Sequence, residues 1–441
     1  MKITLHRPNQ IGGCITEIES DSGTKIVIDL GHNLPRGDEG SPDEFDSPEA
    51  MAKLLQGVSA ILYTHNHGDH VELFNLVPEG IPQYIGPLAA RLLELKYEKL
   101  SVLEKEHDAC VAKIKKLSQF RHYEKGKPFM VGDIRITPFY VSHSATDSYM
   151  LKVECDGKTL LHTGDFREHG YLGKGLQQFL DKYHICGHVD ALVVEGTNVG
   201  QTNKPVKSEQ EVQACFKEIM SRRKNVFILC SSQDADRLES IYKAHWSGRW
   251  RPLVCDAYQK DIMMAIANYS AGQGPYYQFD KNKVIDYWPT KDGLIAKMKE
   301  CGFTMLVRRS DKFDTWLKDI LPFCVPEETS FIYSMYQGYV QKGWSGYSQL
   351  TFDFIQPLVE RSTPCLNIDA PYDYNHTSGH ASTKDLVNLC LKVNPNVIIP
   401  IHKDPKSDFK SILPDELVER VCEGDCCKDG VTILFAPMRI S

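Results

Sequence analysis

One short stretch of the chain, Thr64-His65-Asn66-His67-Gly68-Asp69-His70, places three histidines and an aspartate within six residues. It follows directly on an apolar, β-prone run from Val58 to Tyr63. Such a run is typical of a buried strand, so the polar motif begins where that strand ends. The stretch therefore predicts metal ligands at the carboxyl end of a strand. A polar surface loop that happens to be rich in histidine is the alternative interpretation.

The spacing within this motif predicts two groups of ligands. Residues two apart face the same side of an extended backbone, so His65 and His67 are expected to reach one ion. Asp69 and His70 come after a turn and are expected to point at a second ion. Imidazole and carboxylate ligands suit Zn²⁺, and also Mn²⁺ or Fe²⁺. The sequence thus predicts two divalent ions, with zinc favoured and manganese as an alternative.

Length and charge limit the class of protein. The chain has 441 residues, a net charge of −7 and fourteen cysteines, which are scattered singly except for Cys422, Cys426 and Cys427. We expect reduced core thiols, a cytoplasmic protein and no membrane partner, because the sequence shows neither a signal peptide nor an apolar stretch of spanning length. The acidic net charge means that a polyanion would bind through a local basic patch or through the metal ions.

The pattern of strands and helices predicts one domain inserted in another. Short strands are expected at 3–6, 13–18, 24–30, 134–141, 149–155, 159–162 and 191–194, with a helical hairpin over 88–117. From about Thr202 to Pro364, helix-like pieces alternate with apolar strands, which predicts a parallel sheet. The first pattern resumes with a strand at 365–368, a helix at 385–392 and a strand at 397–401. The predicted domains are therefore 1–201 and 365–441, which form one domain, and 202–364, which is inserted.

Further polar side chains follow other predicted strands: His143, Asp165, Glu195 and His402. Each of them alone has an ordinary structural explanation, such as a hydrogen-bonded histidine or a turn-forming aspartate. Together they suggest that one ion is bound by His65, His67 and His143. The other ion would be bound by Asp69, His70 and His402, and Asp165 would bridge the two ions. Two ions held in this way would make a water-derived nucleophile near neutral pH without a serine or cysteine.

These residues resemble the metallo-β-lactamase superfamily through the H-x-H-x-D-H string. The inserted domain and the later motifs resemble its β-CASP branch of nucleases, of the ribonuclease J type. The motifs are Thr163-Gly164-Asp165-Phe166-Arg167, Glu195, His376 to Ala381 and Pro400-Ile401-His402. The resemblance implies an α/β fold: an αββα metallo-β-lactamase sandwich with an inserted β-CASP α/β domain.

The resemblance also implies roles for single residues. Asp69 works at the scissile phosphodiester, and His380 contacts the phosphate and assists the leaving oxygen. Glu195 orients a neighbouring ligand. Ser378 and His376 are expected to hold a terminal phosphate, with a loop that only positions His380 as the alternative.

The predicted function is a two-metal hydrolase that cleaves phosphodiester bonds of single-stranded RNA, or of DNA, in the cleft between the two domains. The alternatives are a hydrolase of small lactones or thioesters and a non-catalytic scaffold. Cleavage within the nucleic acid strand and cleavage from its 5′ end both remain alternatives. Ribonuclease J carries a further C-terminal domain that is not expected after His402, so the oligomeric state stays open, with a homodimer as one alternative.

Overall fold

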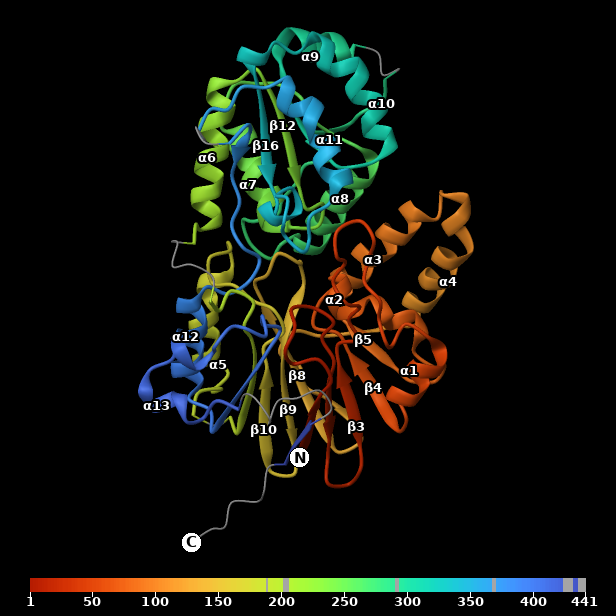
Figure 1. Cartoon of the computed structure of the whole chain (residues 1–441), viewed down its shortest axis with the longest axis vertical. Helices are drawn as coiled ribbons and strands as arrows, with labels where there is room; N and C mark the ends of the chain where they lie inside the picture. Colours follow the sequence, from red (N-terminus) through yellow and green to blue (C-terminus); the bar gives the residue numbers. More distant parts are fainter. Residues whose placement is uncertain (188, 201–205, 290–292, 367–369, 423–430, 435–441) are drawn as a thin grey trace. The chain divides into compact units, whose positions relative to one another are not determined.

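The computed structural model describes residues 1–187, 189–200, 206–289, 293–366, 370–422 and 431–434 (Figure 1). The chain divides into two compact units. The first comprises Met1–Leu34, Ser41–Lys204 and Gly379–Ser441, and the second comprises Pro35–Gly40 and Pro205–Ser378. The predicted boundary near Thr202, Asn367 and Ile368 of the predicted strand at 365–368, and Cys426 and Cys427 lie outside the described residues.

The first unit contains two mixed sheets. The strand order of one is β19 (Val431–Leu434), β1 (Lys2–Leu5), β2 (Thr16–Glu19), β3 (Lys25–Ile28), β4 (Val58–Leu62), β5 (Gln83–Ile85) and β6 (Arg121–His122). The order of the other is β18 (Val397–Ile401), β11 (Ala191–Glu195), β10 (Lys158–His162), β9 (Ser148–Cys155), β8 (Ile134–Val141) and β7 (Phe129–Val131).

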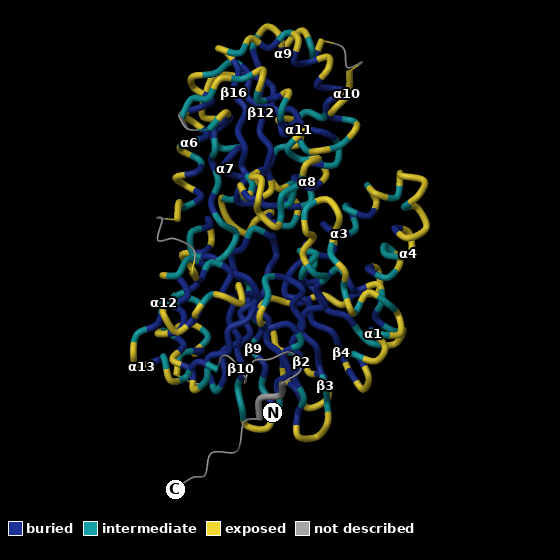
Figure 2. Tube along the Cα trace, in the orientation of Figure 1, coloured by how far each residue is buried: buried dark blue, intermediate teal, exposed yellow. Residues whose placement is uncertain are grey.

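The two sheets pack face to face because their strands alternate apolar residues between two buried sides. Ile26, Ile28, Leu151 and Val193 share one core between the sheets, whereas Val27 belongs to a second core on the outer face of the first sheet. Figure 2 shows the central strands β3, β4 and β9 as largely buried along their length. Both faces of each sheet are therefore covered, which confirms the predicted α/β sandwich.

Helices cover the two outer faces (Figure 1). The first sheet packs against α1 (Pro48–Leu54), α3 (Pro87–Leu100) and α4 (His107–Leu117). The second sheet packs against α5 (Leu176–Lys182), α12 (Thr383–Val393) and α13 (Asp415–Val418). The predicted helical hairpin over 88–117 corresponds to α3 and α4. No helix in the described part of the chain combines the length and the apolar character that a membrane span requires.

Strand direction brings the predicted ligands to one edge of the sandwich. β10, β11 and β18 are parallel to one another, and β8 runs the same way because both β8 and β10 are antiparallel to β9. In the facing sheet, β3 and β4 are also parallel. Residues that follow the carboxyl ends of strands in one direction emerge at the same edge of a sheet.

The second unit is built around a parallel sheet, as the alternation of helices and strands predicted. Its order is β14 (Val284–Asp286), β13 (Leu253–Cys255), β15 (Phe303–Val307), β12 (Asn225–Cys230), β16 (Thr329–Ser334) and β17 (Asp373–Tyr374). Its helices are α6 (Glu209–Arg222), α7 (Ala235–Trp246), α8 (Ala257–Ser270), α9 (Leu294–Cys301), α10 (Asp311–Ile320) and α11 (Gln349–Glu360).

Candidate metal centre

Three histidines from two strand ends form the first ligand group, which we call the histidine cluster: His65 and His67 after β4, and His143 after β8. One ring nitrogen from each lies within 4.8 Å of the others. The closest pair is His143 Nε2 and His67 Nδ1, 3.2 Å apart. His65 and His143 have no exposed side-chain surface. The structure thus brings together the three side chains that the sequence assigned to one ion.

Asp69, His70 and His402 form the second group, which we call the mixed cluster. His402 Nε2 lies 3.2 Å from Asp69 Oδ2, and His70 Nε2 lies 3.9 Å from the same oxygen. Asp69 and His70 are in the short helix α2 (Gly68–Val71), and His402 directly follows β18. Two sheets therefore contribute to this group, as they do to the histidine cluster.

Asp165 lies between the two clusters. Its Oδ2 is 3.9 Å from Nε2 of both His65 and His143, 3.2 Å from Nε2 of His70 and 3.9 Å from Nε2 of His402. The turn after β10 that presents this carboxylate requires Gly164, which has φ of +54° and whose Cβ position would lie 2.9 Å from the Cβ of Thr64. One carboxylate oxygen thus faces ligands of both clusters.

The tautomer of a histidine can be inferred from the hydrogen-bond partner of its Nδ1. His70 Nδ1 lies 2.8 Å from Asp29 Oδ2, and His143 Nδ1 lies 2.6 Å from the carbonyl oxygen of Gly379. Since a carboxylate and a carbonyl only accept hydrogen bonds, both rings carry the proton on Nδ1. The Nε2 lone pairs of these two rings are therefore directed at the clusters.

Two threonines orient the rings of His65 and His402 in the same way. Thr64 donates its hydroxyl to Asp29 Oδ2 at 2.8 Å and so accepts from His65 Nδ1 at 3.0 Å. Thr197 donates to Glu195 Oε2 at 2.7 Å and so accepts from His402 Nδ1 at 2.7 Å. His65 and His402 consequently also present an unprotonated Nε2.

Several buried atoms at the centre lack a hydrogen-bond partner: His65 Nε2, His70 Nε2 and Asp165 Oδ2. Buried polar atoms in proteins are normally satisfied, and unsatisfied ones that converge on one point indicate an ion. Neutral imidazoles and carboxylates are ligands for zinc and for related divalent metals. The residues present therefore fit two divalent ions.

Electrostatics agree with this donor set. Burial lowers the pKa of His65 and His143 well below the ordinary value and that of His67 to about 4, so these rings are neutral. Burial opposes the charge of Asp165, but His402 and His70 outweigh it and hold the pKa of Asp165 well below its usual range. Burial also lowers the pKa of His70, yet Asp165 outweighs burial and raises it; an ion bound there would replace that proton.

Glu195 and His380 lie beside the mixed cluster. Glu195 Oε1 accepts the backbone N–H of Phe166 at 3.0 Å and that of Ala381 at 3.2 Å, and its Oε2 is 3.1 Å from His380 Nδ1. Burial lowers the pKa of His380, but Glu195 and Asp165 outweigh it and raise that pKa to about 9. The side chain of His380 is 21% exposed. A cationic imidazole thus reaches solvent next to the centre.

Residues 26–217 match the family model of the beta-lactamase superfamily domain. This part of the chain is therefore similar to the beta-lactamase superfamily domain. The matched residues include the histidine motif, His143, Asp165 and Glu195.

Curated relatives match most of the chain. Ribonuclease J from Helicobacter pylori (strain B128) is 30% identical over 413 residues, which cover 91% of this chain and 56% of that protein. Ribonuclease J from Sinorhizobium meliloti is 25% identical over 385 residues, which cover 86% and 63%. The chain spans about half to two thirds of the length of these curated relatives. The resemblance to ribonuclease J that the motifs predicted is confirmed.

A solved structure shows the same fold as this chain. It is a crystal structure of a protein of unknown function from Enterococcus faecalis V583, with a TM-score of 0.70 and 17% identity. The match covers 98% of this chain and 99% of the other. The fold of both units therefore has a counterpart among solved proteins.

Ser378 and His376, the predicted phosphate-binding pair, belong to the second unit. Within that unit, His376 Nδ1 accepts a hydrogen bond from Arg237 Nη1 at 3.2 Å, and Ser378 is partly buried. Their role stays a prediction.

Sequence reasoning missed two residues that orient ligands. Asp29, at the end of β3, is fully buried and contacts both His70 and Thr64. Thr197 follows β11 and contacts both Glu195 and His402. Asp29 also follows a strand end, so the signal that identified the ligands could have identified it.

Proposed function

We propose that this chain is a metal-dependent nuclease that hydrolyses phosphodiester bonds of single-stranded RNA. The observation that carries the proposal is the position of Asp165 Oδ2, which lies within 4 Å of an unprotonated Nε2 in both clusters. The name of the relatives, ribonuclease J, supports RNA as the substrate. Zinc is the proposed metal, because imidazole nitrogens dominate the donor set.

In this proposal the histidine cluster holds one divalent ion, the mixed cluster holds the second, and Asp165 is shared. When bound, two such ions supply Lewis acidity to a phosphoryl oxygen and acidify a water molecule. Asp69 keeps its negative charge at the centre, because His402 and His70 hold its pKa below the usual range against the effect of burial. It is the carboxylate that we expect to orient the attacking water.

His380 is proposed to bind the scissile phosphate. Its Nδ1 is engaged by Glu195, and its exposed surface and positive charge suit an anionic oxygen. The same imidazolium is able to donate a proton to the leaving oxygen. Glu195 acts through His380 and through Thr197, and is therefore proposed as a positioning residue.

The test is cleavage of end-labelled single-stranded RNA and DNA by protein stripped of metal and then reloaded with Zn²⁺ or Mn²⁺. Substrates with a 5′-monophosphate and with a 5′-hydroxyl are compared. We expect metal-dependent cleavage of RNA. Release of labelled mononucleotides from the 5′ end would identify an exonuclease, and internal fragments would identify an endonuclease. Cleavage of DNA alone would change the proposed substrate.

Asp69→Asn is the variant that tests the centre, because it keeps the shape of the side chain and removes its charge. We expect it to abolish cleavage. Asp108→Asn, at an exposed aspartate in the first turn of α4, is the matched control and should cleave at the normal rate. Metal-loaded protein without nuclease activity, or full activity of Asp69→Asn, would overturn the proposal.

A further inference from the structure

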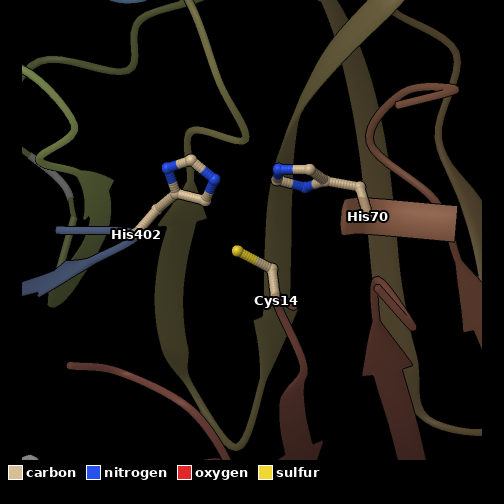
Figure 3. Close-up of side chains that lie close together, drawn as sticks. All are labelled: Cys14, His70 and His402. Atoms are coloured by element: carbon tan, nitrogen blue, oxygen red, sulfur yellow. The ribbon is translucent and has the colours of Figure 1, made fainter. Parts of the chain in front are cut away.

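A cysteine lies next to the mixed cluster. Cys14 is in the loop between β1 and β2, and its Sγ lies within 4.8 Å of a ring nitrogen of both His70 and His402. Figure 3 shows its sulfur between the two imidazole rings and below them in that view. The three residues come from three separate segments, so the group depends on the tertiary fold.

The backbone of Cys14 is bonded to the metal motif itself. Its N–H donates to the carbonyl oxygen of Asp69 at 3.0 Å, and its own carbonyl accepts from the N–H of Gly31 at 3.1 Å. The preceding Gly12 has φ of +79°, and a Cβ at that position would lie 3.0 Å from the Cβ of Asp69. Backbone hydrogen bonds therefore hold this loop against the metal motif.

A second observation points to a ligand at this place. His70 Nε2 is buried, lies in the same group as the sulfur and lacks a hydrogen-bond partner. Its Nδ1 donates to Asp29, so Nε2 is the ring atom left for an ion. Cys14 is 4% exposed and His402 1%, so an ion between them would be shielded from bulk water.

We propose that Cys14 supplies a thiolate ligand to the ion of the mixed cluster. The inference rests on the proposed metal centre and deepens it, because it names the kind of metal. On binding, the thiol loses its proton to solvent and the sulfur bonds to the ion. A thiolate is a soft ligand that selects zinc, cobalt or cadmium over manganese or magnesium. Zinc sites commonly combine a cysteine sulfur with histidine and carboxylate ligands, so sulfur suits the donor set of the mixed cluster.

Other buried cysteines of the chain have apolar surroundings. Cys390 on α12 lies inside the apolar core under the second sheet, and Cys110 on α4 lies inside the apolar core under the first. These thiols behave as small apolar side chains. Cys390 therefore offers a control that is equally buried but is surrounded by the apolar side chains of that core.

The experiment is titration of the metal-stripped full chain with Co²⁺, followed by absorption spectroscopy. Visible d–d bands report cobalt in a site of low coordination number, and a near-ultraviolet charge-transfer band reports a sulfur ligand. We expect both in the natural sequence. Cys14→Ala should lose the charge-transfer band and keep the d–d bands, whereas Cys390→Ala should keep both.

The outcomes separate this inference from the function on which it rests. Visible bands without a charge-transfer band in the natural sequence would overturn the thiolate ligand and leave the metal centre intact. Absence of any bound cobalt would overturn both. If Cys14→Ala does not fold, Cys14→Ser takes its place, and the spectrum of the natural sequence still decides.

Discussion

Asp29 Oδ2 lies 2.8 Å from His70 Nδ1, on the side of the ring opposite to the metal centre. The same carboxylate accepts the hydroxyl of Thr64 through Oδ2 at 2.8 Å and the backbone N–H of Thr64 through Oδ1 at 2.7 Å. Asp29 is fully buried and has φ of +62°. One side chain therefore fixes both the ring of His70 and the beginning of the metal motif.

Asp29→Asn should lower the affinity for the ion of the mixed cluster about 10- to 100-fold, the usual effect of removing a partner behind a metal-binding histidine. Asparagine tolerates positive φ and keeps the hydrogen bond from the Thr64 amide, so we expect the fold to survive. Zinc affinity measured by competition with a chelator tests this, with thermal unfolding of the metal-free protein as the control. Unchanged affinity would show that Asp29 is only structural.

Thr197 makes a second connection behind the ligands. Its hydroxyl donates to Glu195, accepts from His402 Nδ1, and lies 3.1 Å from His380 Nδ1. It therefore connects a ligand of the mixed cluster to the proposed phosphate-binding histidine. Removal of this one hydroxyl should affect both.

Thr197→Val and Thr197→Ser form a matched pair. Valine keeps the shape and removes the hydroxyl, so it should weaken zinc binding about 10-fold and lower the cleavage rate, whereas serine keeps the hydroxyl and should bind zinc almost normally. Chelator competition on both variants is the measurement. Equal affinity of the two variants would contradict the role of the hydroxyl.

The sequence predicted much of the fold because alternation and strand ends are local signals. β8 runs from Ile134 to Val141, the range that the pattern predicted, and His402 directly follows β18, as expected of the predicted ligands. The contacts of Asp29 with His70 and Thr64 were not predictable in this way, because these partners lie far along the chain. Local patterns carry no information about such partners.

The segment after the metal motif is a second place where a distant contact decides the local structure. The apolar spacing from Val71 to Val77 is typical of the start of a helix, but α2 ends at Val71 and a 3₁₀ turn over Glu72–Leu76 follows. The N–H of Leu73 donates to the carbonyl oxygen of Leu30 at 3.2 Å. A bond to a distant loop thus takes the place of the next helical bond, and the spacing of apolar residues could not show it.

Gly31 lies against the backbone of the metal motif. A Cβ at Gly31 would lie 1.7 Å from the carbonyl oxygen of Asp69 and 2.8 Å from the N–H nitrogen of His70. Backbone atoms cannot move aside as a flexible side chain can. The absence of a side chain is therefore a requirement of the metal centre.

Gly31→Ala should displace Asp69 and His70, lower the stability of the fold and abolish zinc binding. Gly175→Ala is the control: Gly175 has φ of −77°, and a Cβ there meets nothing within 4 Å. Thermal unfolding and zinc stoichiometry of the two variants are the measurements. Stoichiometric zinc binding by Gly31→Ala would contradict this explanation of the close approach.

Glu72 connects the α3–α4 hairpin to the segment that follows the metal motif. It is 2.7 Å from Lys96 Nζ, 2.9 Å from Lys113 Nζ and 2.8 Å from the hydroxyl of Tyr97. Burial raises the pKa of Glu72, but the two lysines outweigh it and bring that pKa to about 2. The carboxylate is therefore charged and engaged by two helices.

Glu72→Gln should lower the free energy of unfolding by about 1–3 kcal/mol, because charged groups lose partners in a half-buried place. Urea unfolding measures this, with Glu124→Gln, at an exposed ion pair with Lys127, as the control expected to change little. Faster proteolysis between α3 and α4 in Glu72→Gln would show that the hairpin has loosened. Equal stability of the two variants would mean that the apolar face of the hairpin alone holds it.

His380→Ala separates phosphate binding from metal binding. His380 Nδ1 lies 3.4 Å from Asp165 Oδ2, close enough for the imidazole to belong to the ligand set if its ring rotated. Its shorter contacts, however, are with Glu195 Oε2 and the hydroxyl of Thr197, both at 3.1 Å from Nδ1. We therefore expect His380→Ala to bind two zinc ions normally and to cleave RNA about 10²- to 10⁴-fold more slowly, the usual effect of losing a general acid. Zinc stoichiometry and single-turnover rates test this, and loss of one zinc ion would instead make His380 a ligand.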